Sequence, residues 1–268
     1  RSSDLLANRW SWRLALSWRQ DIQRLNSGMR LRWYDARPEG TDTPCSETEP
    51  RCIPFSYPAQ RYSGSYELRR SWGTQHKFEI AGGAEATRRA YGTPELPNRD
   101  PQAMAQFVER QLPVSDQRVG PFVTLQAYEG RFAQVLDYET LALQEDLRLG
   151  YTASVKVYPA STAVGSSRDL LGTRTALRYL WLPAGGVVHV AAATTSEWST
   201  PGHSQVIVEG GARSVTPQLA FGRLLVDGAF AAAPDNYLNH QFRLGGSARL
   251  RGYLPCRARS EEHTSELQ

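Results

Sequence analysis

Residues 9–19 read Arg-Trp-Ser-Trp-Arg-Leu-Ala-Leu-Ser-Trp-Arg, and apolar and polar side chains alternate along them with only Ala15 neutral. Three of the residues on the apolar face are tryptophans: Trp10, Trp12 and Trp18. A period of two residues indicates a β-strand, because an amphipathic helix repeats every 3.6 residues or so. The stretch is longer than a usual strand of a soluble sheet and matches the roughly 9–11 residues of a membrane-spanning strand. On a soluble sheet, three tryptophans on one face would favour aggregation.

The same alternation returns along most of the chain. We predict ten strands, at residues 9–19, 29–34, 62–69, 78–87, 123–128, 147–157, 174–183, 186–198, 204–215 and 219–233. Long connections at 38–61, 92–120 and 159–173 contrast with short turns at 73–76, 183–186 and 216–218. Short turns on one side and long loops on the other are typical of outer-membrane barrels. The predicted fold class is all-β, a transmembrane antiparallel up-and-down β-barrel.

The composition fits this fold class and argues against others. The 268 residues include 12 Tyr and 7 Trp but only 2 Met, and aromatic side chains gather at the membrane interfaces of barrels. No apolar run is long enough for a transmembrane helix. The formal charge is +4 and the basic residues are spread along the strands, so we expect no nucleic-acid partner.

Cys45 and Cys52 lie together in a loop rich in Pro, Glu and Thr. Their spacing favours a local disulfide in an oxidising compartment over two free thiols. A metal site would need further Cys or His residues close by, and none are near, so we expect neither a metal ion nor a cofactor. Cys256 receives no role.

Charged residues on the polar strand faces form a second group. We expect them to face the barrel interior: Arg13, Arg30, Arg32, Glu67, Arg69, Glu79, Glu85, Arg148 and Lys156. Two interpretations stay open. These groups are either solvated or paired in a water-filled lumen, or some of them contact a docked loop or a passing polypeptide. The histidines are scattered and no catalytic motif is present, so we do not expect an enzyme.

Residues 242–253, Phe-Arg-Leu-Gly-Gly-Ser-Ala-Arg-Leu-Arg-Gly-Tyr, follow the last predicted strand. The paired glycines permit positive φ angles and let a long loop fold back on itself. A guanidinium beside an aromatic ring suits docking among carboxylates and rings. The segment resembles the sixth-extracellular-loop signature of the BamA-like outer-membrane assembly and two-partner secretion barrels, of the bacterial surface antigen type. The residues that carry the resemblance are Leu244, Gly245, Gly246, Leu250, Arg251, Gly252 and Tyr253.

This resemblance implies a barrel whose sixth loop enters the lumen, where groups on the strands that follow hold its arginine. In the family that loop follows the eleventh of sixteen strands. We therefore expect residues 1–258 to be an incomplete barrel, from the second strand to the eleventh, without the first strand, the last five and the POTRA domains. Residues 259–268 resemble a translated sequencing adapter and are kept out of the fold prediction.

The function that the resemblance implies is the insertion or translocation of polypeptides in the bacterial outer membrane. The implied partners are outer-membrane lipid, client polypeptides and accessory periplasmic proteins. One alternative is a passive channel, an orphan barrel or a barrel enzyme, which would have no reason to carry the signature spacing. Another is a soluble β-sandwich or sugar-binding module. A continuous outward band of apolar side chains would exclude a sandwich.

Overall fold

The computed structural model describes residues 10–24, 26–27, 30–37, 44–94, 96–136, 138, 143–220, 222–240, 242–244 and 256–258. Of residues 26–27, 30–31, 242–244 and 256–258, only the backbone is described. The chain divides into two compact units. The first unit comprises Arg1–Leu16, Gly64–Ala86 and Arg118–Asp235, and the second comprises Ser17–Ser63, Thr87–Gln117 and Asn236–Gln268.

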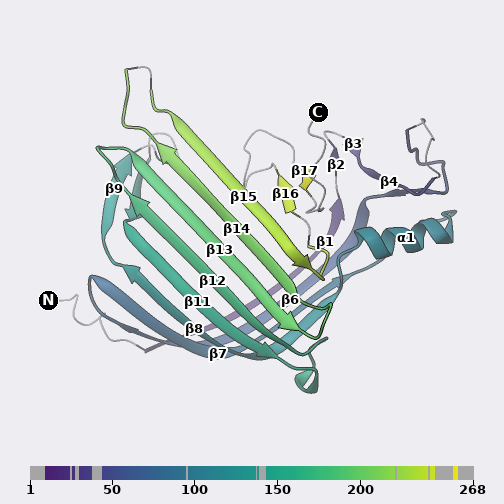
Figure 1. Cartoon of the computed structure of the whole chain (residues 1–268), viewed down its shortest axis with the longest axis horizontal. Helices are drawn as coiled ribbons and strands as arrows, with labels where there is room; N and C mark the ends of the chain where they lie inside the picture. Colours follow the sequence, from purple (N-terminus) through teal and green to yellow (C-terminus); the bar gives the residue numbers. More distant parts are fainter. Residues whose placement is uncertain are drawn as a thin grey trace. The chain divides into compact units, whose positions relative to one another are not determined.

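The dominant element is one antiparallel meander sheet (Figure 1). Its nine strands, in spatial order, are β1 (Trp10–Arg24), β6 (Ser56–Trp72), β7 (His76–Tyr91), β8 (Asp116–Glu129), β11 (Gly150–Ala160), β12 (Leu170–Trp181), β13 (Val187–Ser199), β14 (Gln205–Val215) and β15 (Leu225–Asn236). The expectation of a large antiparallel up-and-down sheet is thus confirmed. Among the described strands β1 and β15 are not neighbours, so the sheet is not closed into a barrel.

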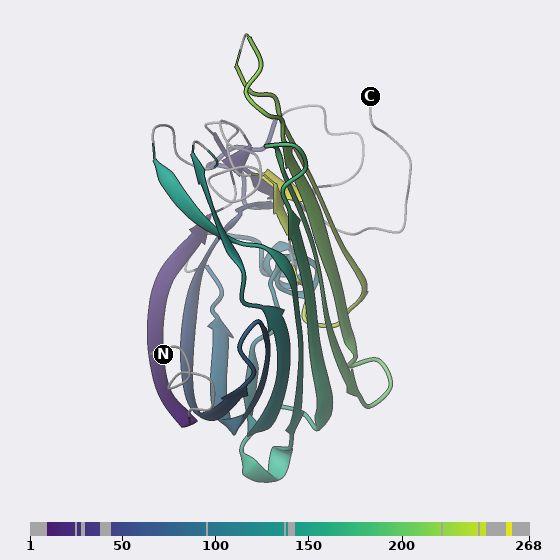
Figure 2. The same ribbon diagram turned by 90° about the vertical axis from the view of Figure 1, so that its left-hand side faces the viewer.

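Register follows the sequence alternation closely in the first unit. Tyr151 lies opposite Tyr179, and Leu177 lies opposite both Ala153 and Ala192, so side chains of like polarity share a face. Figure 2 shows β11 to β14 as one layer of neighbouring strands. The buried apolar side chains of this unit form two small clusters rather than a large core, one around Phe122 and Tyr158, the other around Leu180 and Val187.

The predicted strand at 29–34 is the one that does not join this sheet, which therefore has nine strands and not ten. Its residues belong instead to β3 (Arg30–Leu31), paired with β2 (Asn26–Ser27), and to β4 (Trp33–Asp35), paired with β5 (Cys52–Pro54). The physical reason lies at Tyr34, which was expected on the polar face but packs against Phe55 and Phe107.

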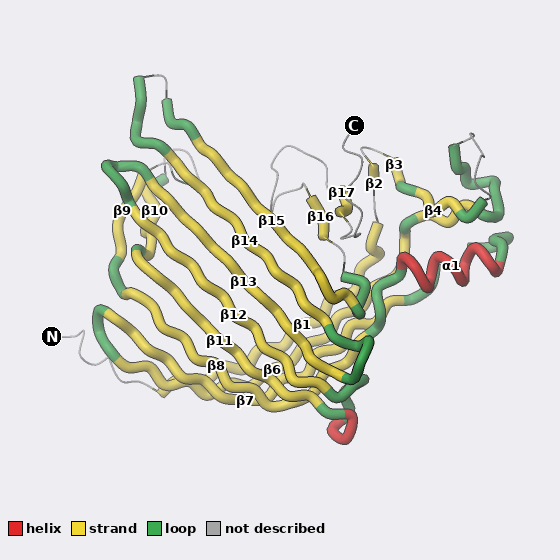
Figure 3. Tube along the Cα trace, viewed as in Figure 1, coloured by secondary structure: helices red, strands yellow, loops and turns green. Residues whose placement is uncertain are grey.

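Two further differences concern the connections. The predicted strand at 147–157 is divided between β10 (Gln144–Arg148) and β11, because Gly150 has a φ of 77°, which is left-handed. β10 pairs with β9 (Phe132–Leu136) as a separate hairpin. The loop predicted at 92–120 contains the helix α1 (Pro101–Gln111), which Figure 3 shows with the short 3-10 turn η2 (Thr162–Val164). No helix among the described residues is long and apolar enough to cross a membrane.

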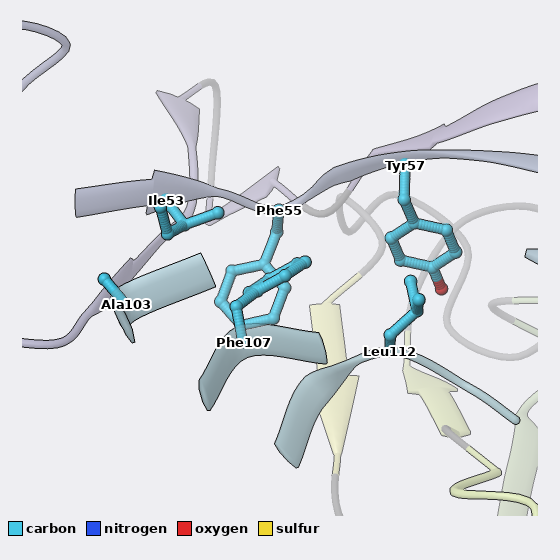
Figure 4. Packing of buried hydrophobic residues seen from close by; sticks show 6 residues of the cluster. All are labelled: Ile53, Phe55, Tyr57, Ala103, Phe107 and Leu112. Atoms are coloured by element: carbon cyan, nitrogen blue, oxygen red, sulfur yellow. The ribbon is translucent and has the colours of Figure 1, made fainter. Parts of the chain in front are cut away.

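The second unit has a conventional hydrophobic core, built where α1 meets β5 and the start of β6. Ile53, Phe55 and Phe107 are buried there, with the Phe55 and Phe107 ring centroids 5.4 Å apart (Figure 4). Asp100 caps α1 by accepting a hydrogen bond from the Gln102 amide, and Pro101 begins the helix. The core thus fixes the helix and the long connections of this unit to one another.

Candidate functional site

The strongest candidate site is the nine-stranded sheet, most of which lies in the first unit, because its two faces differ sharply. One face is apolar and open to the surroundings. The exposed fraction is 70% for Trp12, 55% for Leu177 and 58% for Phe230, on strands that are far apart in the sheet order. Between these strands lie other exposed apolar side chains of the same face, among them Leu68, Ile80, Leu125, Val155 and Val190. Contiguous apolar surface on this scale marks a binding or membrane surface.

This exposure bears directly on the β-sandwich alternative. A sandwich would bury Trp10, Trp12 and Trp18 between two sheets, but their exposed fractions are 60%, 70% and 68%. Within the described ranges, every other sheet has only two strands. The structure therefore does not have the two stacked sheets that this alternative requires.

Aromatic side chains gather at one end of the apolar face. We call this set the aromatic row; its members are Trp10, Trp72, Phe78, Tyr151, Tyr179 and Trp181. They stand within two residues of the ends of their strands, on β1, β6, β7, β11 and β12. Leu171, opposite Trp198, lies eight residues from Tyr179 along β12, which is about 27 Å at the rise of a β-strand. An apolar band of roughly this height between aromatic girdles is typical of membrane barrels.

The opposite face is polar and holds its charges in networks. In the first network, Arg69 donates to Glu67 at 2.8 Å and to Glu79 at 2.9 Å. Glu79, only 7% exposed, also accepts hydrogen bonds from Ser71 at 2.9 Å and Tyr128 at 2.8 Å. These partners satisfy a carboxylate that would otherwise be costly to remove from water.

Three more of the predicted charges also have partners: Glu85, Arg148 and Lys156. The Arg148 guanidinium lies 4.5 Å from the centroid of the Tyr128 ring, although β10 is outside the nine-stranded sheet. Lys156 pairs with Glu85 and also lies 4.1 Å from the centroid of the Phe122 ring. Each charge therefore has an opposite charge or a ring face beside it.

A further network, around Glu197, is the most buried of those described here and was not predicted. Glu197 is 3% exposed and forms ion pairs with Arg118 and Arg168. Its Oε1 also accepts a hydrogen bond from the Tyr158 hydroxyl at 2.9 Å. Register explains this last contact: Gly172 lies between Tyr158 and Glu197, and a Cβ on it would lie 2.1 Å from the Tyr158 ring. The absent side chain lets Tyr158 reach across β12 to the carboxylate.

Arg174 and Arg178 differ from the other cations of the polar face. Both are exposed on β12, and no carboxylate pairs with either among the described residues. They stand four residues apart, so their side chains leave the same face. These two charges can bind an anionic group that approaches the polar face.

The remaining predicted charges lie elsewhere. Arg13 is exposed in β1, and Arg32 lies between β3 and β4, with its guanidinium 5.8 Å from the Phe55 ring centroid. The strand expected at 29–34 does not join the nine-stranded sheet, and Arg32 therefore lies outside that sheet too. Arg30 belongs to β3, and its side chain is outside the described residues.

Most of the signature segment also falls outside the described residues: Gly245, Gly246, Leu250, Arg251, Gly252 and Tyr253. Its flanks are described as backbone. Leu244 ends β16 (Phe242–Leu244), which pairs with β17 (Cys256–Ala258) so that Leu244 lies opposite Cys256. The backbone on the two sides of residues 245–255 is therefore paired as a hairpin.

The second unit contributes a disulfide and a set of capping carboxylates. Cys45 and Cys52 are joined in a disulfide, and Asp35 is the one further potential metal ligand grouped with them among the described residues. A backbone hydrogen bond from Gln102, reinforced by Arg51, lowers the pKa of Asp100 below its usual range. In the first unit, hydrogen bonds from Ser161 and Thr162 likewise lower the pKa of Asp169.

Sequence reasoning missed Arg118, Tyr158, Arg168 and Glu197. One signal was present: Glu197 is the only charged residue of β13, in a strand of otherwise apolar and small polar side chains. A lone carboxylate in such a strand requires a cation from neighbouring elements when it is buried. Comparisons with models of protein families, with curated proteins and with solved structures find no match for this chain.

Proposed function

We propose that the nine-stranded sheet is part of a bacterial outer-membrane β-barrel that inserts or translocates polypeptides. The observation that carries the proposal is the contrast between the two faces of the sheet. Trp12, Leu177 and Phe230 are exposed on one face, while Glu79 and Glu197 are buried among partners on the other. Apolar side chains outside and charged side chains inside are the reverse of a water-soluble protein. This distribution suits a barrel with lipid hydrocarbon outside and a water-filled lumen inside.

The proposed task rests on the signature hairpin. β16 and β17 hold its ends together, which is compatible with a loop that enters the lumen and presents Arg251 and Tyr253. Arg174 and Arg178 would give the lumen wall unpaired cations for a polar or acidic stretch of a passing chain. The proposed task makes and breaks no covalent bond, and we therefore propose no enzymatic activity.

The membrane placement is tested with single-tryptophan variants of the full chain, in micelles of a maltoside detergent with a brominated alkyl chain. Bromine quenches an indole only when the two are in contact. A variant that keeps only Trp12 should be quenched strongly. A variant that keeps only Trp33, which is half-buried in the second unit, should be quenched weakly. Equal quenching of the two variants would refute the lipid-facing assignment.

The activity is tested in vesicles that contain the full chain, to which an unfolded outer-membrane protein is added as client. The proposal expects the client to become folded and protease-resistant faster than in empty vesicles. It also expects Arg251→Ala to lower that rate, while Arg13→Ala, an exposed arginine of β1, does not. A passive channel, the alternative, would conduct ions without changing the rate of client folding.

A further inference from the structure

Arg70 is a cation on the apolar face of β6. Strand alternation places it with Leu68 and Trp72, on the face opposite to Arg69. Its guanidinium carbon lies 5.2 Å from the Trp10 ring centroid and 5.1 Å from the Trp72 ring centroid. The side chain is therefore held between two members of the aromatic row.

The surroundings of Arg70 leave its hydrogen-bond donors unused. A guanidinium has five N–H donors, and aromatic rings attract its charge without offering oxygen acceptors. Among the described residues, Arg70 makes the two ring contacts and no ion pair. Its neighbour Arg69, by contrast, is paired with both Glu67 and Glu79 on the polar face.

A guanidinium that pairs with no carboxylate of the described residues is free to take an anion from outside the chain. Phosphate matches its planar fork with two parallel hydrogen bonds, which makes arginine a preferred phosphate ligand. The exposed apolar residues Tyr66 and Leu68 continue from Arg70 along the same strand. An amphiphile bound here could place its phosphate on Arg70 and its acyl chains along this surface.

We propose that Arg70, clamped between Trp10 and Trp72, is a binding site for the headgroup phosphate of a membrane phospholipid. This inference rests on the proposed membrane-spanning sheet, and it adds a specific lipid contact to it. Trp10 and Trp72 both contact the guanidinium, so part of its ordering is already done before the phosphate binds. The site depends on two strands, β1 and β6, and so it also links them at this end of the sheet.

The test uses the full chain in plain maltoside micelles, with dihexanoyl phosphatidylglycerol as probe and phosphorus NMR as readout. Saturable binding to the unaltered chain is expected, with Arg70→Gln weakening it about tenfold through the loss of a charge-assisted fork. Arg70→Lys keeps the charge but not the fork, and should bind with an intermediate affinity. Arg174→Gln is the matched control, because it removes an unpaired arginine from the opposite face, and it should bind as the unaltered chain does.

Competition with inorganic phosphate separates a lipid site from a general anion site. The proposal expects inorganic phosphate to leave phosphatidylglycerol binding unchanged, and full competition would overturn it. Equal binding by the unaltered chain and Arg70→Gln would also overturn it, as would an equal loss in Arg174→Gln. If Arg70→Gln fails to fold, Trp10→Leu removes one side of the clamp, and it too should weaken binding.

The outcome can be told apart from a failure of the proposed function. Strong bromine quenching of Trp12 together with Arg70-independent phospholipid binding would refute this site and leave the membrane placement standing. Arg70-dependent binding without quenching of Trp12 would do the reverse, since a phosphate site would then exist on a sheet that does not face hydrocarbon.

Discussion

Two regions of this chain, the surroundings of α1 in the second unit and the sheet around Glu197 in the first, differ in the charged and apolar side chains that they bury. In the second unit, Phe107 and Ile53 are fully buried, and the Arg51–Asp100 ion pair lies at the surface. In the first unit, Glu197 and Arg168 are buried, and Trp12 is 70% exposed. Around α1 the second unit therefore has an apolar inside and a charged outside, as expected of a fold in water. On the sheet of the first unit large apolar side chains are outside instead, and the difference teaches that the same types of residue take opposite positions in the two regions.

The largest loss of stability is expected at Glu197, the buried carboxylate of the first unit. Glu197→Gln leaves Arg118 and Arg168 without the carboxylate that both contact. Breaking a buried ion pair by removing one partner typically costs about 3–5 kcal/mol. We expect the urea midpoint of the full chain in maltoside micelles, followed by β-sheet circular dichroism, to fall accordingly.

Asp227→Asn is the control for this variant. It removes the carboxylate of the Arg213 pair on the same face, where Asp227 is 38% exposed, and such pairs contribute about 1 kcal/mol or less. If both variants lowered the midpoint equally, burial would not be what makes the Glu197 network important. The contrast between the two units would then lose its main support.

The second unit should be destabilised most by loss of apolar packing. Phe107→Ala removes a fully buried ring that contacts Phe55 and Tyr34, and such truncations cost about 3–5 kcal/mol. Hydrogen exchange should rise in α1 and β5 while β12 and β13 keep their protection, because their own contacts are intact. Glu109→Ala, at an exposed position of the same helix, should leave exchange unchanged. Loss of protection in β12 would show that the units do not hold together separately.

How far the sequence predicts this molecule depends on what each pattern reports. Alternation in residues 9–19 predicts β1 because one whole face of that strand meets the same surroundings. Alternation in 29–34 misleads because Tyr34 packs into an aromatic core, so both faces of β4 are half-buried. Short alternating runs of this kind do not distinguish a strand of the large sheet from a short paired segment in a connection.

The missed helix and the missed ion network have different explanations. Asp100 followed by Pro101 is a helix start signal, but it comes shortly after Pro94, Pro97 and Asn98, which favour a loop. The Glu197 network could not be read from spacing, since Arg118 lies in β8, Glu197 in β13 and Arg168 in the connection that precedes β12. The predicted group of Glu67, Arg69 and Glu79 was brought together because β6 and β7 are adjacent in the sheet.

A smaller effect is expected from Gly172→Ala. The added Cβ would lie 2.1 Å from the Tyr158 ring and force that ring away from Glu197. Overpacking of this kind costs about 1–3 kcal/mol. The same urea titration should show the loss, and it should largely disappear when Tyr158→Ala is added. Gly228→Ala, where a Cβ meets nothing within 4 Å, should be close to neutral, and a loss there as large as at Gly172 would contradict this account.

The smallest effects concern one capping carboxylate in each unit, outside the sheet strands. The pKa of Asp169 is lowered by hydrogen bonds from Ser161 and Thr162, and that of Asp100 by the Gln102 amide and then by Arg51. A carboxyl group whose folded pKa is depressed stabilises the fold above its unfolded pKa of about 4. This stabilisation is lost as the pH falls through the folded pKa. Both caps should therefore weaken in acid, and neither should change between pH 6 and 8.

High salt should affect the pH dependence at Asp100 and Asp169 differently, because different groups stabilise the two carboxylates. Arg51 lies 2.9 Å from Asp100, and exposed ion pairs are screened by salt, whereas the donors to Asp169 are a hydroxyl and an amide of neutral residues. Hydrogen exchange of α1 should therefore show a smaller pH 3-to-6 difference in high salt, and that of η2 should not. Asp100→Asn and Asp169→Asn should each abolish the pH dependence at their own site only. A salt effect of equal size at η2 would mean that long-range charge, and not local hydrogen bonding, sets the Asp169 pKa.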